Sequence, residues 1–432
     1  MPTVSICIPS YNHAVYLPAA IDSALAQTYR DLEVVVVDDG STDDSLEIAR
    51  AYERREPERV RVFTHPGNAN RGISETANLA REHARGLHWS GLPSDDVMHQ
   101  DRVARLMAKL ARHPDLDVVY SYARYVDTAG RPLPELGLFG VDITRESHPV
   151  DLLIPGNLIA GMTVLARRER FDPVGFHEEG LVYSDWELWL RVFASLRVGF
   201  VPAVLADYRV HEANTSVGAE ISVHLARQLE VIETLERKLN AVPAFRRARF
   251  RALVALEHAY LRFCIGELDV AKDHVHAAFE REPGLRASPA PLAYFLARWE
   301  ADVLHPHLRA AAYSRAAARL RRTAANGGGS GLEEPPAGNF GLWLLSTQAR
   351  IGEPRASRDW LRLVAAVQLV TAAREHRRAG ENARAASALV QALRTYPRLL
   401  TGRTPRSFFS RSVTPRVVRA IAMRQALLGA GA

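Results

Sequence analysis

The sequence is poor in cysteine and has no long apolar run. Its two cysteines, Cys7 and Cys264, stand alone, which argues against a disulfide framework or a zinc site; we expect both to be small core residues. No apolar stretch reaches the roughly 18 residues of a membrane-spanning helix, and the most hydrophobic segment, 152–166, is interrupted at Pro155. The N-terminus has no basic, apolar and small-residue signal layout. These absences predict a cytoplasmic protein without a membrane span.

Acidic residues are absent from the C-terminal end, where nine arginines follow Glu381 and no aspartate or glutamate does. The net charge of +6 conceals an uneven distribution. Residues 1–218 carry 22 basic and 31 acidic side chains, whereas residues 219–432 carry 33 and 18. A preference for arginine codons explains why only three of the basic residues are lysines, but it does not explain why acidic residues are missing after Glu381. The asymmetry indicates a module that meets an anionic partner such as nucleic acid, phospholipid or a lipid diphosphate.

The first 125 residues alternate β-branched runs with amphipathic stretches. The runs predict strands over residues 4–8, 32–37, 60–64, 87–92 and 118–122. The amphipathic stretches predict helices over residues 15–26, 43–54, 74–85 and 100–112. A further helix near 186–194 and a strand near 198–208 follow in a less regular part. This alternation predicts an α/β fold with a mostly parallel sheet covered by helices on both faces.

Two acidic pairs stand where apolar runs end. Asp38-Asp39 closes the run 32–37, and Asp95-Asp96 follows a shorter strand pattern. In open α/β sheets, ligands bind beyond the carboxyl ends of the strands. Adjacent carboxylates repel each other unless a cation lies between them and an anionic ligand. The pairs therefore predict a metal-bound nucleotide site, although each also fits a turn or a helix start in which aspartate caps backbone N–H groups.

Five short blocks occur in an order and spacing that resemble the family 2 glycosyltransferases. They are Pro-Ser-Tyr-Asn at 9–12, Gln-Thr-Tyr at 27–29, Asp-Asp-Gly-Ser-Thr-Asp at 38–43, Asn-Arg-Gly at 70–72 and Ser-Asp-Asp at 94–96. Ser-Asp-Trp-Glu at 184–187 and Tyr-Arg-Val-His at 208–211 are similar to two further blocks of that family. The resemblance covers about residues 1–216 and implies a GT-A fold, a Rossmann-like sheet between helices.

The resemblance implies roles in donor binding for several of these residues. Asp39, beside Asp38, is expected to accept a hydrogen bond from the nucleobase, and Pro9 and Tyr11 are expected to line its pocket. Asn78 is expected among the nucleotide-sugar-binding residues. Four departures from the family pattern, Ala77, Pro93, Gln100 and Ser184, leave these residues in place but weaken any inference about the sugar.

The same resemblance implies a metal centre next to the donor diphosphate. Asp95 is expected near the ribose, Asp96 as a ligand of Mn²⁺ or Mg²⁺, Arg209 near the diphosphate and His211 as a further metal ligand. Arg209 and His211 stand two residues apart, so they would lie on one face of an extended segment. None of the other histidines shows a ligand spacing in the sequence.

Asp185 matches the catalytic base of the family. It precedes an amphipathic pattern in which Trp186, Trp189 and Leu190 turn inward. A carboxylate that is partly desolvated beside aromatic rings has a raised pKa, which suits a general base. The competing interpretation is an N-cap aspartate that opens the helix.

The second half of the chain has an Ala-, Arg- and Leu-rich helical pattern. We predict a domain over 1–218, a helical domain over 219–325, a flexible Gly/Pro-rich loop over 326–338 and a helical domain with a basic tail over 339–432. The stretches from Ala255 and from Thr371 share a helix, a glycine turn, a second helix and a proline. This spacing fits a tetratricopeptide-like repeat, and an ordinary all-α bundle fits it equally well.

The basic tail contains a second amphipathic pattern. From Thr414 onward, Val417 and Ile421 share one face of a helix and Arg416 and Arg419 lie around the other. Such a helix can bind peripherally to an anionic membrane surface, or its apolar face can pack on neighbouring helices.

These features predict a metal-dependent, inverting glycosyltransferase of the hexosyltransferase type (EC 2.4). It would move a sugar from a nucleotide-sugar, with UDP favoured over dTDP or GDP, to a glycan or lipid-linked acceptor in cell-surface polysaccharide synthesis. The alternative is a degenerate transferase domain that serves as a nucleotide-sugar-binding or scaffolding module. The presence of Asp39, Asp95, Asp96 and Asp185 together argues against it. No nucleic-acid recognition motif accompanies the basic tail.

Overall fold

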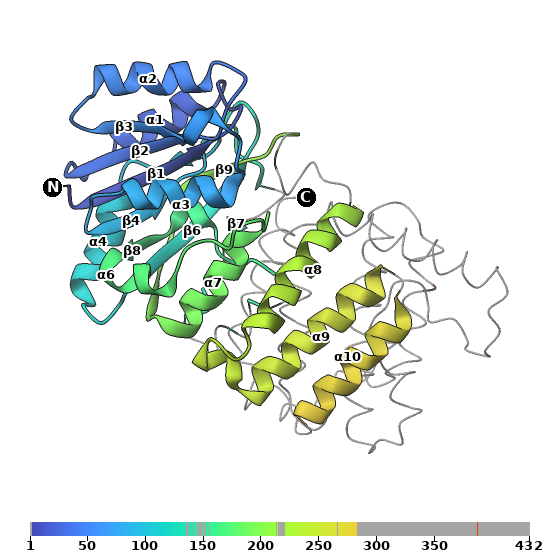
Figure 1. Cartoon of the computed structure of the whole chain (residues 1–432). Helices are drawn as coiled ribbons and strands as arrows, with labels where there is room; N and C mark the ends of the chain where they lie inside the picture. Colours follow the sequence, from blue (N-terminus) through green and yellow to red (C-terminus); the bar gives the residue numbers. More distant parts are fainter. Residues whose placement is uncertain are drawn as a thin grey trace. The chain divides into compact units, whose positions relative to one another are not determined.

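The structure, a computed structural model, describes residues 2–134, 138–140, 142–144, 150, 153–154, 156–212, 214, 221–265, 267–282 and 387. The chain divides into two compact units, Met1–Phe245 and Arg246–Ala432. The first unit contains the sheet (Figure 1) and every residue with a predicted role in donor binding, metal binding or catalysis. Each unit is described separately below.

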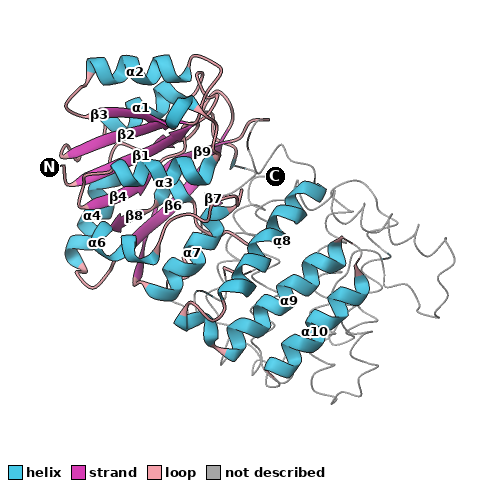
Figure 2. Cartoon of the chain, in the orientation of Figure 1, coloured by secondary structure: helices cyan, strands magenta, loops and turns pink. Residues whose placement is uncertain are grey.

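The first unit is built on a nine-stranded sheet in the order β3-β2-β1-β4-β8-β6-β9-β5, with β7 paired to β6 (Figure 2). Its strands are β1 (Val4–Ser10), β2 (Leu32–Asp38), β3 (Val60–Thr64), β4 (His88–Gly91), β5 (Val97–Met98), β6 (Val118–Val126), β7 (Leu138–Phe139), β8 (Leu165–Arg167) and β9 (Val198–Arg209). The helices of this unit are α1 (Leu17–Leu25), α2 (Ser45–Arg55), α3 (Ile73–His83), α4 (Arg102–Arg112), α6 (Arg168–Phe171), α7 (Ser184–Ser195) and α8 (Ile221–Lys238).

The sheet is mixed: its longer strand pairs are parallel, as predicted, and its two-residue pairs are antiparallel. The pairs β1–β2, β2–β3, β1–β4 and β6–β9 are parallel, as the alternation of strands and helices predicts. The pairs β4–β8, β6–β8, β6–β7 and β5–β9 are antiparallel. Every antiparallel pair contains one of the short strands β5, β7 and β8, whose sequences carry no strand pattern of their own.

Helices cover the two faces of the sheet. All seven residues of β2 are buried, as expected of a continuous apolar run in a parallel sheet. In α1 the buried Leu17, Ala20, Ile21 and Ala24 repeat with helical spacing and join the same core as residues of α2 and α4. On the other face, the buried Cys7 donates a hydrogen bond to the Ala80 carbonyl of α3 at 3.3 Å. Cys7 is thus a buried free thiol, as predicted.

The second unit contains the helices α9 (Ala248–Cys264) and α10 (Leu268–Arg281). They agree with the first predicted helix pair of the repeat pattern, and α9 buries Phe250, Leu253 and Leu261. The second stretch of that pattern, the predicted loop over 326–338 and the basic tail lie outside the described residues. The repeat, the domain boundaries and the membrane helix therefore stay predictions. Among the described helices, none has both the length and the apolar character needed to cross a membrane.

Candidate active site

The first acidic pair lies at the carboxyl end of β2, and its two carboxylates face different surroundings. Asp38 is fully buried; its Oδ2 accepts a hydrogen bond from the Ser41 N–H at 2.9 Å, and its Oδ1 has no hydrogen-bond partner. Asp39 accepts from the Arg71 N–H at 2.6 Å and from the Gly72 N–H at 2.9 Å. Asp39 therefore fixes the turn that precedes α3, while Asp38 shapes the turn that follows β2.

Gly40 allows this turn to lie close to the neighbouring loop. Its φ of +70° belongs to the left-handed region, and a Cβ there would lie 2.6 Å from the Asn68 carbonyl oxygen. Any side chain at this position would therefore displace the backbone of the loop 68–70. The glycine after the acidic pair is required by the geometry of the site.

The Pro-Ser-Tyr-Asn block forms the end of β1 and the turn beside this pair. Ser10 is in register with Asp38, so Pro9 and the exposed Tyr11 flank the same edge of the sheet. Asn12, in the left-handed region with φ 52°, accepts from the Thr42 N–H at 2.8 Å. This bond joins the loops that follow β1 and β2. The structure thus brings the predicted base-pocket residues together at the carboxyl ends of adjacent strands.

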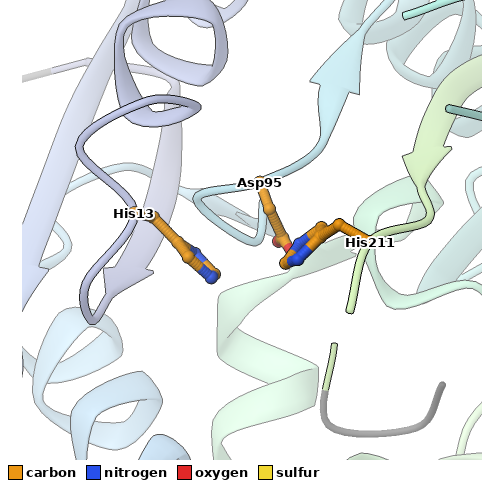
Figure 3. A group of neighbouring side chains, drawn as sticks. All are labelled: His13, Asp95 and His211. Atoms are coloured by element: carbon orange, nitrogen blue, oxygen red, sulfur yellow. The ribbon is translucent and has the colours of Figure 1, made fainter. Parts of the chain in front are cut away.

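A cluster of Asp95, His211 and His13 lies at the same edge of the sheet (Figure 3). Asp95 follows β4, His211 follows β9 and His13 lies between β1 and α1. Asp95 Oδ2 is 3.0 Å from His211 Nε2, and one donor atom from each of the three residues lies within 4.8 Å of the others. Asn214 Nδ2 donates to Asp95 Oδ2 at 3.1 Å and holds the carboxylate in place.

Asp96, the next residue, is predicted to be a metal ligand, and that role stays a prediction. It is 1% exposed, and its Oδ1 accepts a hydrogen bond from the Arg209 backbone N–H at 2.9 Å. Burial and then the charge of Asp95 raise the pKa of Asp96 well above its usual value. Oδ1 of Asp96 thus supports the end of β9, whereas its buried Oδ2 has no hydrogen-bond partner; Asp95 faces His211.

Arg209 is also turned into the protein. Its Nε donates to the Asp95 carbonyl at 2.9 Å, and its Nη1 donates to the Asp127 and Thr128 carbonyls at 3.2 and 3.0 Å. The guanidinium carbon lies 5.2 Å from the centre of the Tyr16 ring. Three backbone carbonyls thus fix the position of this cation next to the acidic pair.

Asp185 is the second residue of α7, and the N-cap of that helix is Tyr183. The competing interpretation of Asp185 as the N-cap therefore does not hold. Its Oδ1 accepts from the Trp186 N–H at 2.8 Å, and its Oδ2 accepts from the side chain of Asn157 at 2.7 Å. Burial raises the pKa of Asp185 to about 6, against the lowering effect of these hydrogen bonds. A carboxylate with this pKa is mostly ionised at neutral pH and basic enough to accept a proton.

The first turn of α3 connects the two acidic regions. Gly72 donates to Asp39; two residues later Ser74 Oγ donates to the Leu181 carbonyl at 2.7 Å and lies 2.8 Å from Oγ of Ser184, the residue before Asp185. Asp39 and Asp185 therefore share one hydrogen-bonded support.

Asn78 holds a loop of the protein in place. Its amide donates to the His177 carbonyl at 3.0 Å and accepts from the His177 N–H at 2.8 Å, and the residue is 8% exposed. Both polar ends of the side chain are thus used internally. The predicted contact of Asn78 with the nucleotide-sugar stays a prediction.

The sequence did not predict a role in the site for three of its residues, His13, Asn157 and Asn214. His13 follows the Pro-Ser-Tyr-Asn block directly, but nothing in its spacing links it to His211. Asn157 interrupts an apolar segment. A polar side chain in such a segment is expected to be buried and hydrogen-bonded to another polar group, which was a usable signal. Asn214 stands three residues after His211 in a segment without periodicity.

The donor set at the cluster fits a divalent cation. Two donor atoms about 2.1 Å from one ion and at right angles to each other are about 3 Å apart, as Asp95 Oδ2 and His211 Nε2 are. Burial lowers the pKa of His13, which favours the neutral imidazole that a metal requires. Asp95, His211 and His13 offer donor atoms that could hold such an ion, and Asp96, whose Oδ2 has no hydrogen-bond partner, stays a predicted ligand.

Comparisons with known proteins identify the family of the chain. The sequence model described as Glycosyl transferase family 2 matches residues 5–153. A glycosyltransferase of Rickettsia typhi is 33% identical over 239 residues, which are 54% of this chain and 70% of that protein. The chain belongs to the family 2 glycosyltransferases. Residues 5–153, which the family model matches, lie within the first unit of this chain.

Two further relatives define the fold and the breadth of the family. Chondroitin synthase of Pasteurella multocida is 39% identical over 217 residues, half of this chain but 22% of the synthase. The crystal structure of S. aureus TarS with UDP-GlcNAc superposes with a TM-score of 0.51 at 20% identity, over 72% of this chain and 90% of that one. This likeness shows the GT-A fold. Three of the first five relatives are matched over only about a third of their length.

Proposed function

We propose that the protein is a metal-dependent, inverting glycosyltransferase that uses a nucleotide-sugar, with a UDP-sugar as the first donor to test. The observation that carries this proposal is Asp185, a carboxylate with a pKa raised to about 6 that shares a hydrogen-bonded support with Asp39. TarS, which has the same fold, was solved with UDP-GlcNAc. We propose a glycan or lipid-linked acceptor in cell-surface polysaccharide synthesis, because a chondroitin synthase is among the relatives.

In the proposed mechanism the residues at the ends of β1 and β2 bind the nucleotide. Pro9 and Tyr11 line the base pocket, and Asp39 accepts a hydrogen bond from the base with lone pairs that its backbone partners leave free. A divalent cation held by Asp95, His211 and His13 would neutralise charge on the departing diphosphate. Arg209 stabilises the end of β9 and so keeps His211 facing Asp95.

Asp185 acts as the general base on the acceptor hydroxyl. Its Oδ2 is held by Asn157 and its Oδ1 by the helix backbone, so its orientation is fixed before the acceptor binds. Deprotonation by a positioned carboxylate lets the acceptor oxygen attack the anomeric carbon from the face opposite the diphosphate. A single displacement of this kind inverts the configuration at that carbon.

A donor screen tests the proposal. The full-length protein is incubated with UDP-, dTDP- and GDP-sugars and Mn²⁺, and release of the nucleoside diphosphate is measured, with Asp185→Asn as the inactive comparison. Hydrolysis or transfer of one donor supports an enzyme. Tight binding of a donor without any turnover, even with candidate acceptors, would favour the nucleotide-sugar-binding module instead.

The pH profile of turnover follows from the pKa of Asp185. Because the base must be ionised, kcat at saturating donor and metal is expected to be level above about pH 7 and to fall below about pH 6, by roughly tenfold per pH unit. Donor affinity measured over the same pH range serves as the control, because a fall in affinity would show that acid disrupts the nucleotide site rather than protonating Asp185 alone. A kcat that stays constant down to pH 5 would contradict the role of Asp185.

Replacement of Asn157 is expected to move this profile to higher pH. The Asn157 side chain stabilises the ionised form of Asp185, so Asn157→Ala raises the pKa of Asp185 and shifts the acid limb of kcat upward. The measurement is the pH dependence of kcat for both proteins, with thermal melting to check the fold. A lower kcat with an unshifted limb would mean that Asn157 has only a packing role.

A further inference from the structure

The segment between α6 and α7, residues 172–183, is bound to α3 by side-chain hydrogen bonds. Asn78 of α3 binds both backbone groups of His177: its Oδ1 accepts from the N–H at 2.8 Å, and its Nδ2 donates to the carbonyl at 3.0 Å. About one helical turn further along α3, the buried Arg81 donates from Nη1 to the Gly175 carbonyl at 2.8 Å. Polar backbone groups paired in this way hold a segment in one conformation. The position of His177 is therefore set by α3.

Arg191 of α7 holds the same segment from its other side. Its Nη2 donates to the Phe176 carbonyl at 2.6 Å, and its guanidinium forms an ion pair with the fully buried Glu187 at 2.8 Å. Gly175 permits this close approach, because its φ is +96° and a Cβ there would lie 3.1 Å from Arg191 Nη1. The segment thus reaches His177 with its backbone fixed by two helices.

From this position the His177 ring contacts the start of α7. Its Nδ1 lies 3.1 Å from Oγ of Ser184, the first residue of the helix and the neighbour of Asp185. A hydroxyl has a single proton, and Ser74 gives its own to the Leu181 carbonyl at 2.7 Å. For both of its contacts to be hydrogen bonds, Ser184 must donate to Ser74, 2.8 Å away, and accept from His177. The chain then runs from His177 Nδ1–H through both serines to the Leu181 carbonyl.

The His177 ring is neutral across the neutral pH range. Burial, and then the charges of Arg81 and Arg191, lower its pKa to about 3. A histidine with the usual pKa of about 6.5 would change charge in the same pH range as Asp185. The contact with Ser184 therefore stays constant while Asp185 titrates with its pKa of about 6.

We propose that His177 is a positioning residue for the catalytic base: its hydrogen bond to Ser184 fixes the first turn of α7 and with it the direction of the Asp185 carboxylate. This inference rests on the role of Asp185 in the proposed function and adds the residue that orients it. Asp185 Oδ2 accepts from Asn157 at 2.7 Å, a bond that requires the two side chains to keep their separation. Without a donor at position 177, Ser184 loses one of its two supports, and the bond between Asp185 and Asn157 weakens.

Two substitutions of His177 separate its hydrogen bond from the shape of its ring. His177→Phe keeps a ring in this space but has no donor, whereas His177→Asn keeps an N–H close to the place of Nδ1. We expect His177→Phe to lower kcat about tenfold or more, with donor affinity within about threefold. The acid limb of kcat should move to higher pH, because Asp185 stays buried while the hydrogen bond that stabilises its ionised form weakens. We expect His177→Asn to keep kcat within about threefold of wild type.

His83→Phe is the matched control for these variants. His83 is also partly buried and lies on α3, at the end away from Ser74, where its ring stacks on Phe63 with centres 3.6 Å apart. The substitution keeps this stacking and touches no part of the chain that leads to Ser184. Both kcat and the acid limb should therefore stay as in wild type.

The pKa of Asp185 is also measured without transfer, by carboxyl ¹³C NMR of the full-length protein labelled at aspartate. The Asp185 signal is identified by its loss in Asp185→Asn. A pKa of about 6 is expected in wild type, and one higher by about half a pH unit or more in His177→Phe. If His177→Phe does not fold, Ser184→Ala breaks the same chain with a smaller change in volume, and the same rise is expected.

The outcomes separate this inference from the proposed function. An unchanged pKa of Asp185 in His177→Phe, or an equal loss of kcat in His177→Phe and His177→Asn, would overturn the positioning role and leave the proposed transferase intact. Wild type that transfers no sugar, yet shows the expected difference in the pKa of Asp185, would instead contradict the proposed function and support the positioning of the carboxylate.

Discussion

Replacing Asp185 by asparagine is expected to lower kcat by on the order of 10²-fold or more, with donor affinity changed less than about threefold. The amide retains the size of the carboxylate and the hydrogen bond from the Trp186 N–H, but it cannot accept the proton of the acceptor. The nucleotide is bound elsewhere, around Asp39, so the lost charge is not part of its site. Steady-state transfer and calorimetric titration of the donor nucleotide measure the two quantities.

A second aspartate at a helix start provides the matched control for Asp185. Asp101 precedes α4 and forms an exposed i,i+4 ion pair with Arg105, a type of contact that contributes little to stability. Asp101→Asn should leave both kcat and donor affinity unchanged. If Asp185→Asn keeps its turnover but loses thermal stability or donor affinity, Asp185 supports the fold and another group accepts the proton.

The local sequence predicts the elements of the first unit well because their patterns are short-range. The apolar run of β2 and the helical spacing of the buried residues in α1 each lie within one segment. By contrast, β5 consists of two residues, and its pairing of Val97 with Asp207 joins positions far apart in the chain. A strand that exists only because of a distant partner leaves no local pattern. The same reason explains why β7 and β8 were not predicted.

The sequence locates the second acidic pair but does not show how its two carboxylates are oriented. Strand ends locate Asp95 and Asp96, yet which one faces His211 depends on how the end of β9 packs against them. The Arg209 N–H binds Asp96 and thereby leaves Asp95 for the cluster. His13 is brought in by the loop after β1, which no sequence spacing connects to His211.

The distinction between Asp95 and Asp96 gives the last prediction. Asp95→Asn is expected to abolish metal-dependent transfer, with a loss of on the order of 10²-fold or more, because the carboxylate ligand next to His211 is removed. Asp96→Asn is expected to keep Mn²⁺ affinity within about threefold, since its side chain is buried and the amide oxygen can still accept from the Arg209 N–H. EPR titration of Mn²⁺ and the transfer rate with and without EDTA measure both effects.

The pair of variants separates two explanations for a loss of activity. A general weakening of the loop after β4 would affect both variants alike and lower the melting temperature of each. Loss of a metal ligand would lower the Mn²⁺ affinity of Asp95→Asn alone, even if its melting temperature were unchanged. Reversed results, with Mn²⁺ affinity lost only in Asp96→Asn, would assign the metal to Asp96 and require the end of β9 to rearrange when the ion binds. Full activity of the wild type in EDTA would exclude the metal role of both carboxylates, and the charge on the leaving diphosphate would then have to be stabilised by protein cations such as Arg209.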